Sequence, residues 1–263
     1  MIRSSHIALV AFCAATVLLV PLAWYIPGFA LWLISAVLTA RDPDPRVRRS
    51  LGTLLGSIAL LAFAPIHTGL DIRHMLTLFL CFASVIAGPV LVMNRLGPGE
   101  LRWRFWPVRF SKRDLFYTFL SIPLAWGVIY LYFFHLNPGL AEHWVLPASY
   151  NANAIRRLVV GINCVGIWDE LFFVNIVYGL LRGIFPARIA NAAQAVVYTS
   201  VLNDMAFTGH GVWIVCLFAL TQGVMYEKSR VLLYVLVVHI IVDLWLVLAI
   251  LQWHYPGHSH GIF

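Results

Sequence analysis

Long apolar runs separated by short polar links make up this chain, and few polar side chains remain to cover a water-exposed surface. Hydrophobic residues fill 61% of the 263 positions and charged residues 11%. A soluble domain carries roughly 25% charged residues, so most of this surface must face lipid. The sequence therefore predicts an all-α fold, a polytopic transmembrane helical bundle forming one integral membrane domain.

The apolar runs predict eight or nine spans, since a spanning helix needs about 20 mostly apolar residues. The first run, residues 7–40, is long enough for two short helices with a turn near Pro27 and Gly28, or for one tilted helix. No signal-peptidase site follows an apolar stretch of normal length, so we expect this run to be retained. The other predicted spans are residues 51–69, 75–93, 115–136, 158–181, 189–207, 212–226 and 231–253.

Basic residues gather on one side of the predicted bundle. With nine spans, fifteen Lys and Arg residues fall on the side of the N-terminus, and only Arg73, Arg156 and Arg157 fall on the other. This bias predicts the orientation, because basic loops stay on the cytoplasmic side. The net charge of +7 comes from these short loops, so we expect no nucleic-acid partner.

The link at residues 95–114 differs from the other loops, because Trp and Phe residues alternate with arginines along it. Aromatic and basic side chains together suit the headgroup layer of a membrane. We expect an interfacial anchor that contacts anionic lipid; a gate for substrate or lipid is the alternative.

Acidic residues within the last four predicted spans are the best candidates for chemistry. A carboxylate at mid-bilayer costs about 2.5–3.5 kcal/mol, so such groups face the bundle interior or a wet cavity. Asp169 and Glu170 are adjacent, about 100° apart on a helix, and can border one cavity. Two close carboxylates can divide the roles of general base and general acid. A polar contact between helices is the alternative.

Further polar residues on the neighbouring spans can join this pair. His239 and Asp243 are four residues apart and share a helix face, and histidine carries protons near neutral pH. They form either part of the site or a packing pair. Asp204 follows Asn203 near the outer end of its span, where it either meets water at a helix terminus or completes the cavity.

Metal and cofactor sites have weak signals. The tail at residues 254–263 holds His254, His258 and His260, but a short His-rich tail is seldom a metal site. We expect no cofactor and no metal ligands, although acids and a histidine inside the membrane leave a divalent metal such as zinc as an alternative. No GxSxG, HExxH, GxGxxG or Walker loop occurs in the sequence.

Three elements on separate predicted helices resemble the motifs of one family. DELFFVN at 169–175 resembles EExxxR, YTSVL at 198–202 resembles FxxxH, and VVHIIVD at 237–243 contains HxxxD. These are the motifs of the CPBP family (CAAX protease and bacteriocin-processing, also called Abi). Its members are intramembrane endopeptidases and include the type II CAAX prenyl endopeptidases. The resemblance covers residues 158–250 and excludes the N-terminal helices.

The resemblance implies hydrolysis of a peptide bond in a membrane-associated protein or peptide. Asp169 or Glu170 would activate a water molecule, with Asp204 assisting, while His239 and Asp243 would polarise the scissile carbonyl. Residues expected to contact the substrate are Asn175, Tyr198 and Asn203. The resemblance also implies a bacterial inner (plasma) membrane.

The implied organisation has three parts. Residues 1–157 hold the N-terminal helices, residues 158–253 the four-helix catalytic core, and residues 254–263 the His-rich tail. Val174 stands where the family has arginine, and Leu202 stands where it has histidine. These departures motivate a second hypothesis, a catalytically inactive protein of this fold that binds or escorts a membrane partner. A third, a metal-dependent site or proton-coupled transporter, follows from the four acids and the histidine.

Overall fold

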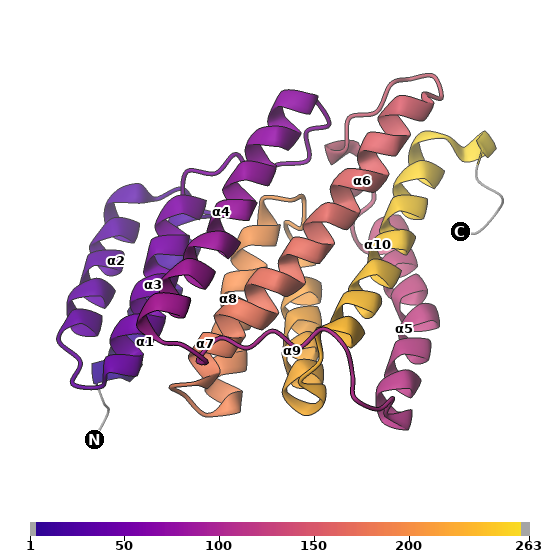
Figure 1. Ribbon diagram of the computed structural model, residues 1–263. Helices are drawn as coiled ribbons and strands as arrows, with labels where there is room; N and C mark the ends of the chain where they lie inside the picture. Colours follow the sequence, from indigo (N-terminus) through magenta and orange to yellow (C-terminus); the bar gives the residue numbers. More distant parts are fainter. Residues whose placement is uncertain (1–3, 259–263) are drawn as a thin grey trace.

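The computed structural model describes residues 4–258, which form an all-α bundle without strands. Nine helical rods follow one another within these residues, each antiparallel to the one before (Figure 1). The rods are α1 Ser4–Leu19, α2 Tyr25–Ala40, α3 Pro45–Leu61, α4 Ile72–Leu96, α5 Lys112–Leu131 with the π-helical η1 Tyr132–Leu136, α6 Ala152–Asp169 with the π-helical η3 Glu170–Tyr178 and α7 Gly179–Arg182, α8 Ala187–Asn203, α9 Gly211–Ser229, and α10 Leu232–His254. Short 3₁₀ turns cover Leu140–His143 and Pro256–His258.

The positions of the rods agree with the predicted spans, but several boundaries differ by up to eight residues. The first turn is at residues 20–24 rather than near Pro27 and Gly28. Pro27 lies in the first turn of α2, where a helix loses no hydrogen bond to proline. The span predicted at 51–69 begins at Pro45 after an Asp44 cap and ends at Leu61. Pro65 then keeps the chain out of helix.

Four helical stretches in the described chain are long and apolar enough to cross a membrane, fewer than the eight or nine predicted. They are Ile72–Leu96, Lys112–Leu136, Ala152–Arg182 and Leu232–His254. The helices α1 and α2 have 16 residues each, or about 24 Å of rise, against a hydrocarbon core of about 30 Å. Polar residues reduce the apolar length of α9, which carries Gln222, Glu227 and Lys228 in its second half.

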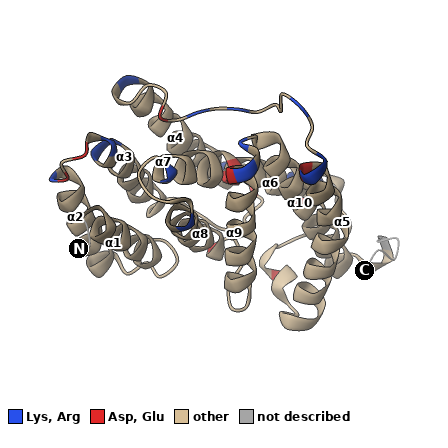
Figure 2. Cartoon of the chain, turned by 90° about the horizontal axis from the view of Figure 1, so that it is seen from below, with Lys and Arg blue, Asp and Glu red and all other residues tan. Residues whose placement is uncertain are grey.

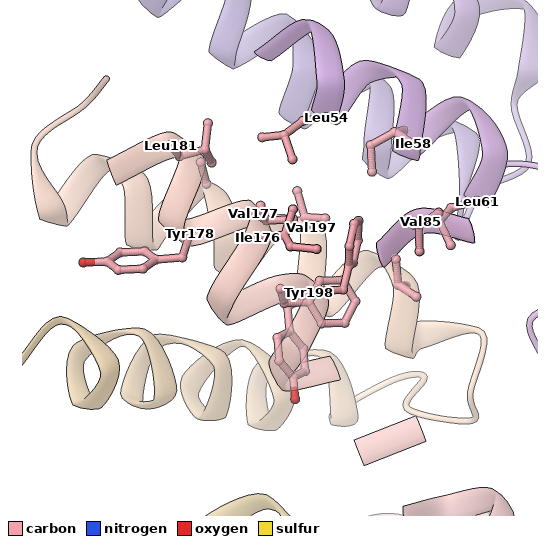
Figure 3. Close-up of a cluster of buried hydrophobic side chains, with 14 of the residues drawn as sticks. Leu54, Ile58, Leu61, Val85, Ile176, Val177, Tyr178, Leu181, Val197 and Tyr198 are labelled. Carbon is pink, nitrogen blue, oxygen red and sulfur yellow. The ribbon is translucent and has the colours of Figure 1, made fainter. Parts of the chain in front are cut away.

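The main core lies where α3, η3 and α8 meet, and it joins N-terminal helices to C-terminal ones. Figure 3 shows Leu54 and Ile58 of α3 facing Val177 of η3, with Val197 of α8 beside them. These four side chains are almost completely buried. These contacts join residues on both sides of position 157. The predicted catalytic core at residues 158–253 is therefore packed against the N-terminal helices. A second cluster joins η1, α6 and the end of α10.

Trp168 connects α4 to the main core. Its ring stacks on Phe82 with centroids 3.7 Å apart, and its indole Nε1–H donates to the Phe82 carbonyl at 2.9 Å. Phe172 packs on it at 5.2 Å.

An extended strap at residues 97–111 links α4 to α5 and crosses the basic end of the bundle. Figure 2 shows Lys and Arg along the strap and near α3 and α7. Trp106 and Phe110 of the strap are exposed. The Leu232 and Leu233 N–H groups donate to the carbonyls of Arg104 and Phe105 at 2.9 and 3.1 Å. The strap thus satisfies two of the free N–H groups that begin α10.

Glu227 fixes the basic end of the rod that contains η3. Its carboxylate accepts hydrogen bonds from the hydroxyl of Tyr178 and, at 3.2 Å, from Nε of Arg182. Arg230 completes the cluster with a 2.7 Å ion pair. These bonds join η3 and α7 to α9.

The packing of Trp168 predicts a large effect of truncation. Trp168→Ala should lower the free energy of unfolding by about 3–5 kcal/mol, because a buried ring and its contacts are lost. Thermal unfolding in detergent measures this change. Trp213 on α9 is 74% exposed and serves as the matched control, so Trp213→Ala should leave the midpoint nearly unchanged. Equal shifts for the two variants would contradict the packing described.

Candidate functional site

A buried histidine on α10 organises the polar groups at the centre of the last helices. His239 Nδ1 lies 2.7 Å from Glu170 Oε1 and 3.2 Å from the Tyr198 hydroxyl. Gln222 Nε2 of α9 donates to the same Glu170 oxygen at 3.0 Å and to the Val235 carbonyl at 3.2 Å. When Glu170 is ionised its oxygen can only accept, and Nδ1 of His239 is then the donor of this hydrogen bond. Glu170 of η3 and Tyr198 of α8 thus contact the ring, and Gln222 of α9 holds Glu170.

The opposite edge of the imidazole faces two aspartates. His239 Nε2 lies 3.6 Å from Asp169 Oδ2 and 3.6 Å from Asp243 Oδ1. Both aspartates are almost completely buried, as is Glu170. Around one imidazole, the structure therefore collects three carboxylates from two rods.

The local geometry depends on a change of helix type between the two acids. α6 ends at Asp169, and the nine-residue η3 begins at Glu170. A π-helix has a wider turn than an α-helix and is often found at functional sites. At this change of helix type, Glu170 lies at Nδ1 of the ring and Asp169 at Nε2.

Gly166 lets α10 approach α6 at the site. A Cβ atom here would overlap Asp243 Oδ2 and lie 2.9 Å from His239 Cδ2. Any side chain at this position would push the aspartate or the helix away. The glycine is one turn before Asp169, so the close approach and the acid belong to the same stretch of helix.

A cavity of about 490 Å³ opens onto the Nε2 side of this cluster. Asp169, His239 and Asp243 lie on its wall, whereas Glu170 does not. The rest of the lining is mainly aliphatic and comes from α4, α5, α6, α9 and α10. One oxygen of each aspartate, Asp169 Oδ1 and Asp243 Oδ2, has no hydrogen-bond partner among the described residues.

The link between α3 and α4 closes one end of the cavity. His67, Thr68 and Leu70 line it there. The rings of His67 and His74 stack 3.6 Å apart. Partial burial, and then the neighbouring His74, lower the pKa of His67 below its ordinary value. His67 thus lies at the rim of the cavity.

The structure brings together some of the predicted residues and separates others. Asp204 follows the last residue of α8 and accepts from Asn203 at 3.4 Å. Neither residue lines the cavity or contacts the histidine cluster. Partial burial raises the pKa of the Asp204 carboxyl above its ordinary value. Asn175 accepts from the Tyr226 hydroxyl at 2.6 Å, away from the ring of His239.

The two residues that depart from the family motifs also lie in apolar surroundings. Val174 is completely buried in the main core, and Leu202 lines the cavity. No side chain at these positions can therefore supply charge to the cluster.

The sequence analysis did not identify Gln222, which hydrogen-bonds Glu170. It is a polar side chain within an apolar predicted span, which is the signal that identified the carboxylates. A search limited to acids and histidines passes over it.

Metal ligands do not gather in the described part of the chain. No group of three or more His, Cys, Asp or Glu side chains in residues 4–258 is arranged to hold a metal ion. His254 bonds the Ala141 carbonyl at 3.0 Å. His260 of the tail lies outside the described residues.

No family model, no curated protein and no solved structure matches this chain. The likeness to the CPBP family therefore rests on the motif residues alone and remains a hypothesis.

The close approach at Gly166 predicts that a single methyl group disturbs the site. Gly166→Ala should lower the free energy of unfolding by about 1–3 kcal/mol, because an added Cβ overlaps Asp243. Thermal unfolding in detergent measures the loss. Gly161→Ala on the same helix is the control, since its Cβ would meet only Met75 Cε at 3.5 Å. That variant should be neutral or slightly stabilised; a loss as large as that of Gly166→Ala would argue against the described contact.

Proposed function

We propose that this protein is an intramembrane endopeptidase that hydrolyses a peptide bond of a membrane-associated protein or peptide with a carboxylate-activated water. The observation that carries the proposal is the pair of aspartates facing Nε2 of His239, each at 3.6 Å, on the wall of an apolar cavity. An active site needs both a proton acceptor and a proton donor within reach of one bond. This cluster offers both.

The chemistry follows from how two carboxylates and an imidazole share protons. Close carboxylates in an apolar site keep one proton between them, which leaves one as base and the other as acid. We assign Asp169 as the base that takes a proton from the attacking water. The water oxygen bonds to the scissile carbonyl carbon, and the C–N bond then breaks. Asp243 carries the proton of the pair. This proton passes through His239 to the nitrogen of the leaving amine.

Glu170 has a different role in this proposal from the one its motif position implies. It lies behind His239 and is absent from the cavity wall. We therefore infer that Glu170 orients the imidazole, as the third member of a triad does. Gln222 and Tyr198 support it through their contacts with Glu170 and His239. Asp169, which the cavity exposes, replaces Glu170 as the base.

The surroundings of the site suit an apolar substrate segment. We propose that all nine rods lie in the membrane, the shorter ones packed around the four that are long enough to span it. The cavity is then enclosed by helices at bilayer depth, where an extended apolar peptide can exchange lipid contacts for cavity contacts.

A second candidate function is supported by the two apolar motif positions. With Val174 and Leu202 in place of charged residues, the cluster lacks partners that the family motif supplies. A protein of this kind would bind or escort a membrane partner in the cavity without cutting it.

Cleavage by purified protein tests the first proposal. Asp169→Asn and His239→Ala should each reduce cleavage of a transmembrane reporter peptide by about 10²–10⁴-fold, since each removes a proton-transfer group. Glu170→Gln should lose less, because its amide oxygen can still accept from Nδ1. Asp44→Asn is the matched control: this residue caps α3, and asparagine caps equally well, so cleavage should not change.

The same variants separate the two candidates. If wild-type protein cleaves nothing, yet the Asp169→Asn, His239→Ala double variant supports its cellular role fully, the escort function replaces the peptidase. Cleavage that survives both single substitutions would show that the site is assigned to the wrong residues.

The basic strap is the surface that we propose for anionic lipid. Arginines and exposed aromatic rings alternate along it, and both suit the headgroup layer. Replacing Arg102, Arg104 and Arg109 by Gln should lower the amount of phosphatidylglycerol retained by purified protein, as counted by native mass spectrometry. The control triple replaces the three arginines of the opposite end, Arg73, Arg156 and Arg157, and should retain lipid as the wild type does. Equal losses from both triples would contradict this assignment.

A further inference from the structure

We propose that the link between α3 and α4, residues 62–71, closes the outer end of the cavity and opens it when His67 takes up a proton. The outer end is the end farthest from the basic strap. The inference concerns access to the cavity, and it holds whether or not the protein cleaves a peptide.

The α3–α4 link is a non-helical part of the cavity wall. His67, Thr68, Gly69 and Leu70 all line the cavity. Figure 1 shows the link at the end of the bundle where α6 begins and α10 ends, and the strap crosses the opposite end. Because these four residues lie outside the helices, a few local contacts determine the shape of this part of the wall.

A hydrogen bond between the first and third of these residues holds the turn. The Gly69 N–H donates to Nδ1 of His67 at 3.1 Å. A backbone N–H can only donate, so Nδ1 carries no proton and the neutral ring has its proton on Nε2. A proton taken up by this ring therefore binds at Nδ1. The Gly69 N–H would then lose its acceptor and face a second N–H group, so the closed turn fits only neutral His67.

Close packing prevents the ring from accommodating the added proton in place. The rings of His67 and His74 stack with centroids 3.6 Å apart. A Cβ atom at Gly69 would lie 2.7 Å from Cε1 of His67 and 3.0 Å from Cδ2 of His74, so both rings lie against the Gly69 backbone. Repulsion between two N–H groups at this contact therefore displaces the ring or the link.

The groups around His67 determine how easily it is charged. His74 of α4 is 8% exposed, and its Nε2–H donates to the His67 carbonyl at 3.1 Å. Asp71 accepts from the backbone N–H of His74 at 2.9 Å, a bond that lowers the pKa of its carboxyl and keeps it ionised near neutral pH. His143 meets the link through its carbonyl, which accepts from the Thr68 hydroxyl. Partial burial and the neighbouring His74 outweigh Asp71, and the pKa of His67 is lowered.

The direction of the pH effect follows from these contacts. Because the closed link favours the neutral ring, its stabilisation is complete above the ordinary imidazole pKa of about 6.5. It is lost as the pH falls through the lowered pKa of His67. The His67 side chain is exposed, so protons reach it from water at the outer end. With the orientation predicted from the basic loops, the link responds to the pH on the side opposite the cytoplasm.

Hydrogen exchange of the full chain in nanodiscs of zwitterionic lipid tests the opening of the link. Mass spectrometry follows residues 62–71 between pH 8 and pH 5, with rates corrected for the intrinsic pH dependence of exchange. The open fraction of the link should rise about tenfold over this range, because one hydrogen bond is lost and a repulsive contact replaces it. Thermal unfolding at both pH values checks that the bundle stays folded.

Two substitutions of His67 separate its proton from other effects of pH. His67→Asn keeps an acceptor that does not titrate, because asparagine side chains bond the backbone two residues on, and the link should stay closed at every pH. His67→Leu removes the acceptor and should leave the link open at every pH. His210→Asn is the matched control: His210 is exposed and does not line the cavity, so the wild-type response should remain.

A thiol on the cavity wall tests whether the link controls access. Gly161 of α6 lines the cavity, and a Cβ atom there would meet only Met75 Cε at 3.5 Å, so Gly161→Cys fits. A membrane-impermeant maleimide should label position 161 about tenfold faster at pH 5 than at pH 8, relative to Val145→Cys. Val145 is 81% exposed and lies outside the cavity, so it corrects for the reactivity of the reagent. Adding His67→Asn to Gly161→Cys should abolish the increase.

Three results would overturn the proposal. The first is link exchange in the wild type that does not change with pH. The second is a pH response that persists in His67→Asn, which would assign the proton to another group such as His74. The third is a link that opens while labelling at position 161 stays constant. None of them affects the peptidase proposal, because cleavage is measured separately; equally, loss of the peptidase proposal leaves these measurements as they are. If His67→Leu does not fold, the wild type and His67→Asn decide.

Discussion

The interaction on which the centre of this bundle depends is the 2.7 Å contact between Glu170 and His239. It joins η3 to α10 in a region with no water-exposed surface, where an unpaired carboxylate or imidazolium would be strongly unfavourable. Gln222 and Tyr198 then have fixed partners, and Nε2 of the ring has a fixed direction toward the cavity. Everything proposed about Asp169 and Asp243 follows from the direction of that ring.

The contact also explains why two adjacent acids differ in role. Glu170 is the first residue of a π-helical stretch and lies behind the ring, whereas Asp169 ends an α-helix and lies on the cavity wall. Adjacent positions in sequence therefore become a supporting group and a cavity-lining group.

The sequence could predict the rods but not all of their details. The apolar runs, predicted as eight or nine spans, overlap the nine rods, but only four of the described helical stretches are long and apolar enough to cross a membrane. The ends of the rods differ from the predicted ends where a cap or a proline sets them, as at Asp44 and Pro65. The helices α1 and α2 are too short to cross the membrane alone.

The site was predictable to the extent that buried charge marks it. Asp169, Glu170, His239 and Asp243 converge, and Tyr198 joins them. Asp204 does not join them, because it follows the last residue of α8 and pairs with Asn203 instead. Gly166 and the π-helix carry no comparable signal, since backbone proximity and helix type arise only from packing. At the other end of α10, main-chain carbonyls of the strap accept from Leu232 and Leu233. Because these hydrogen bonds use only backbone atoms, the side chains of the strap can differ between related proteins while the strap still holds the start of the helix that carries His239.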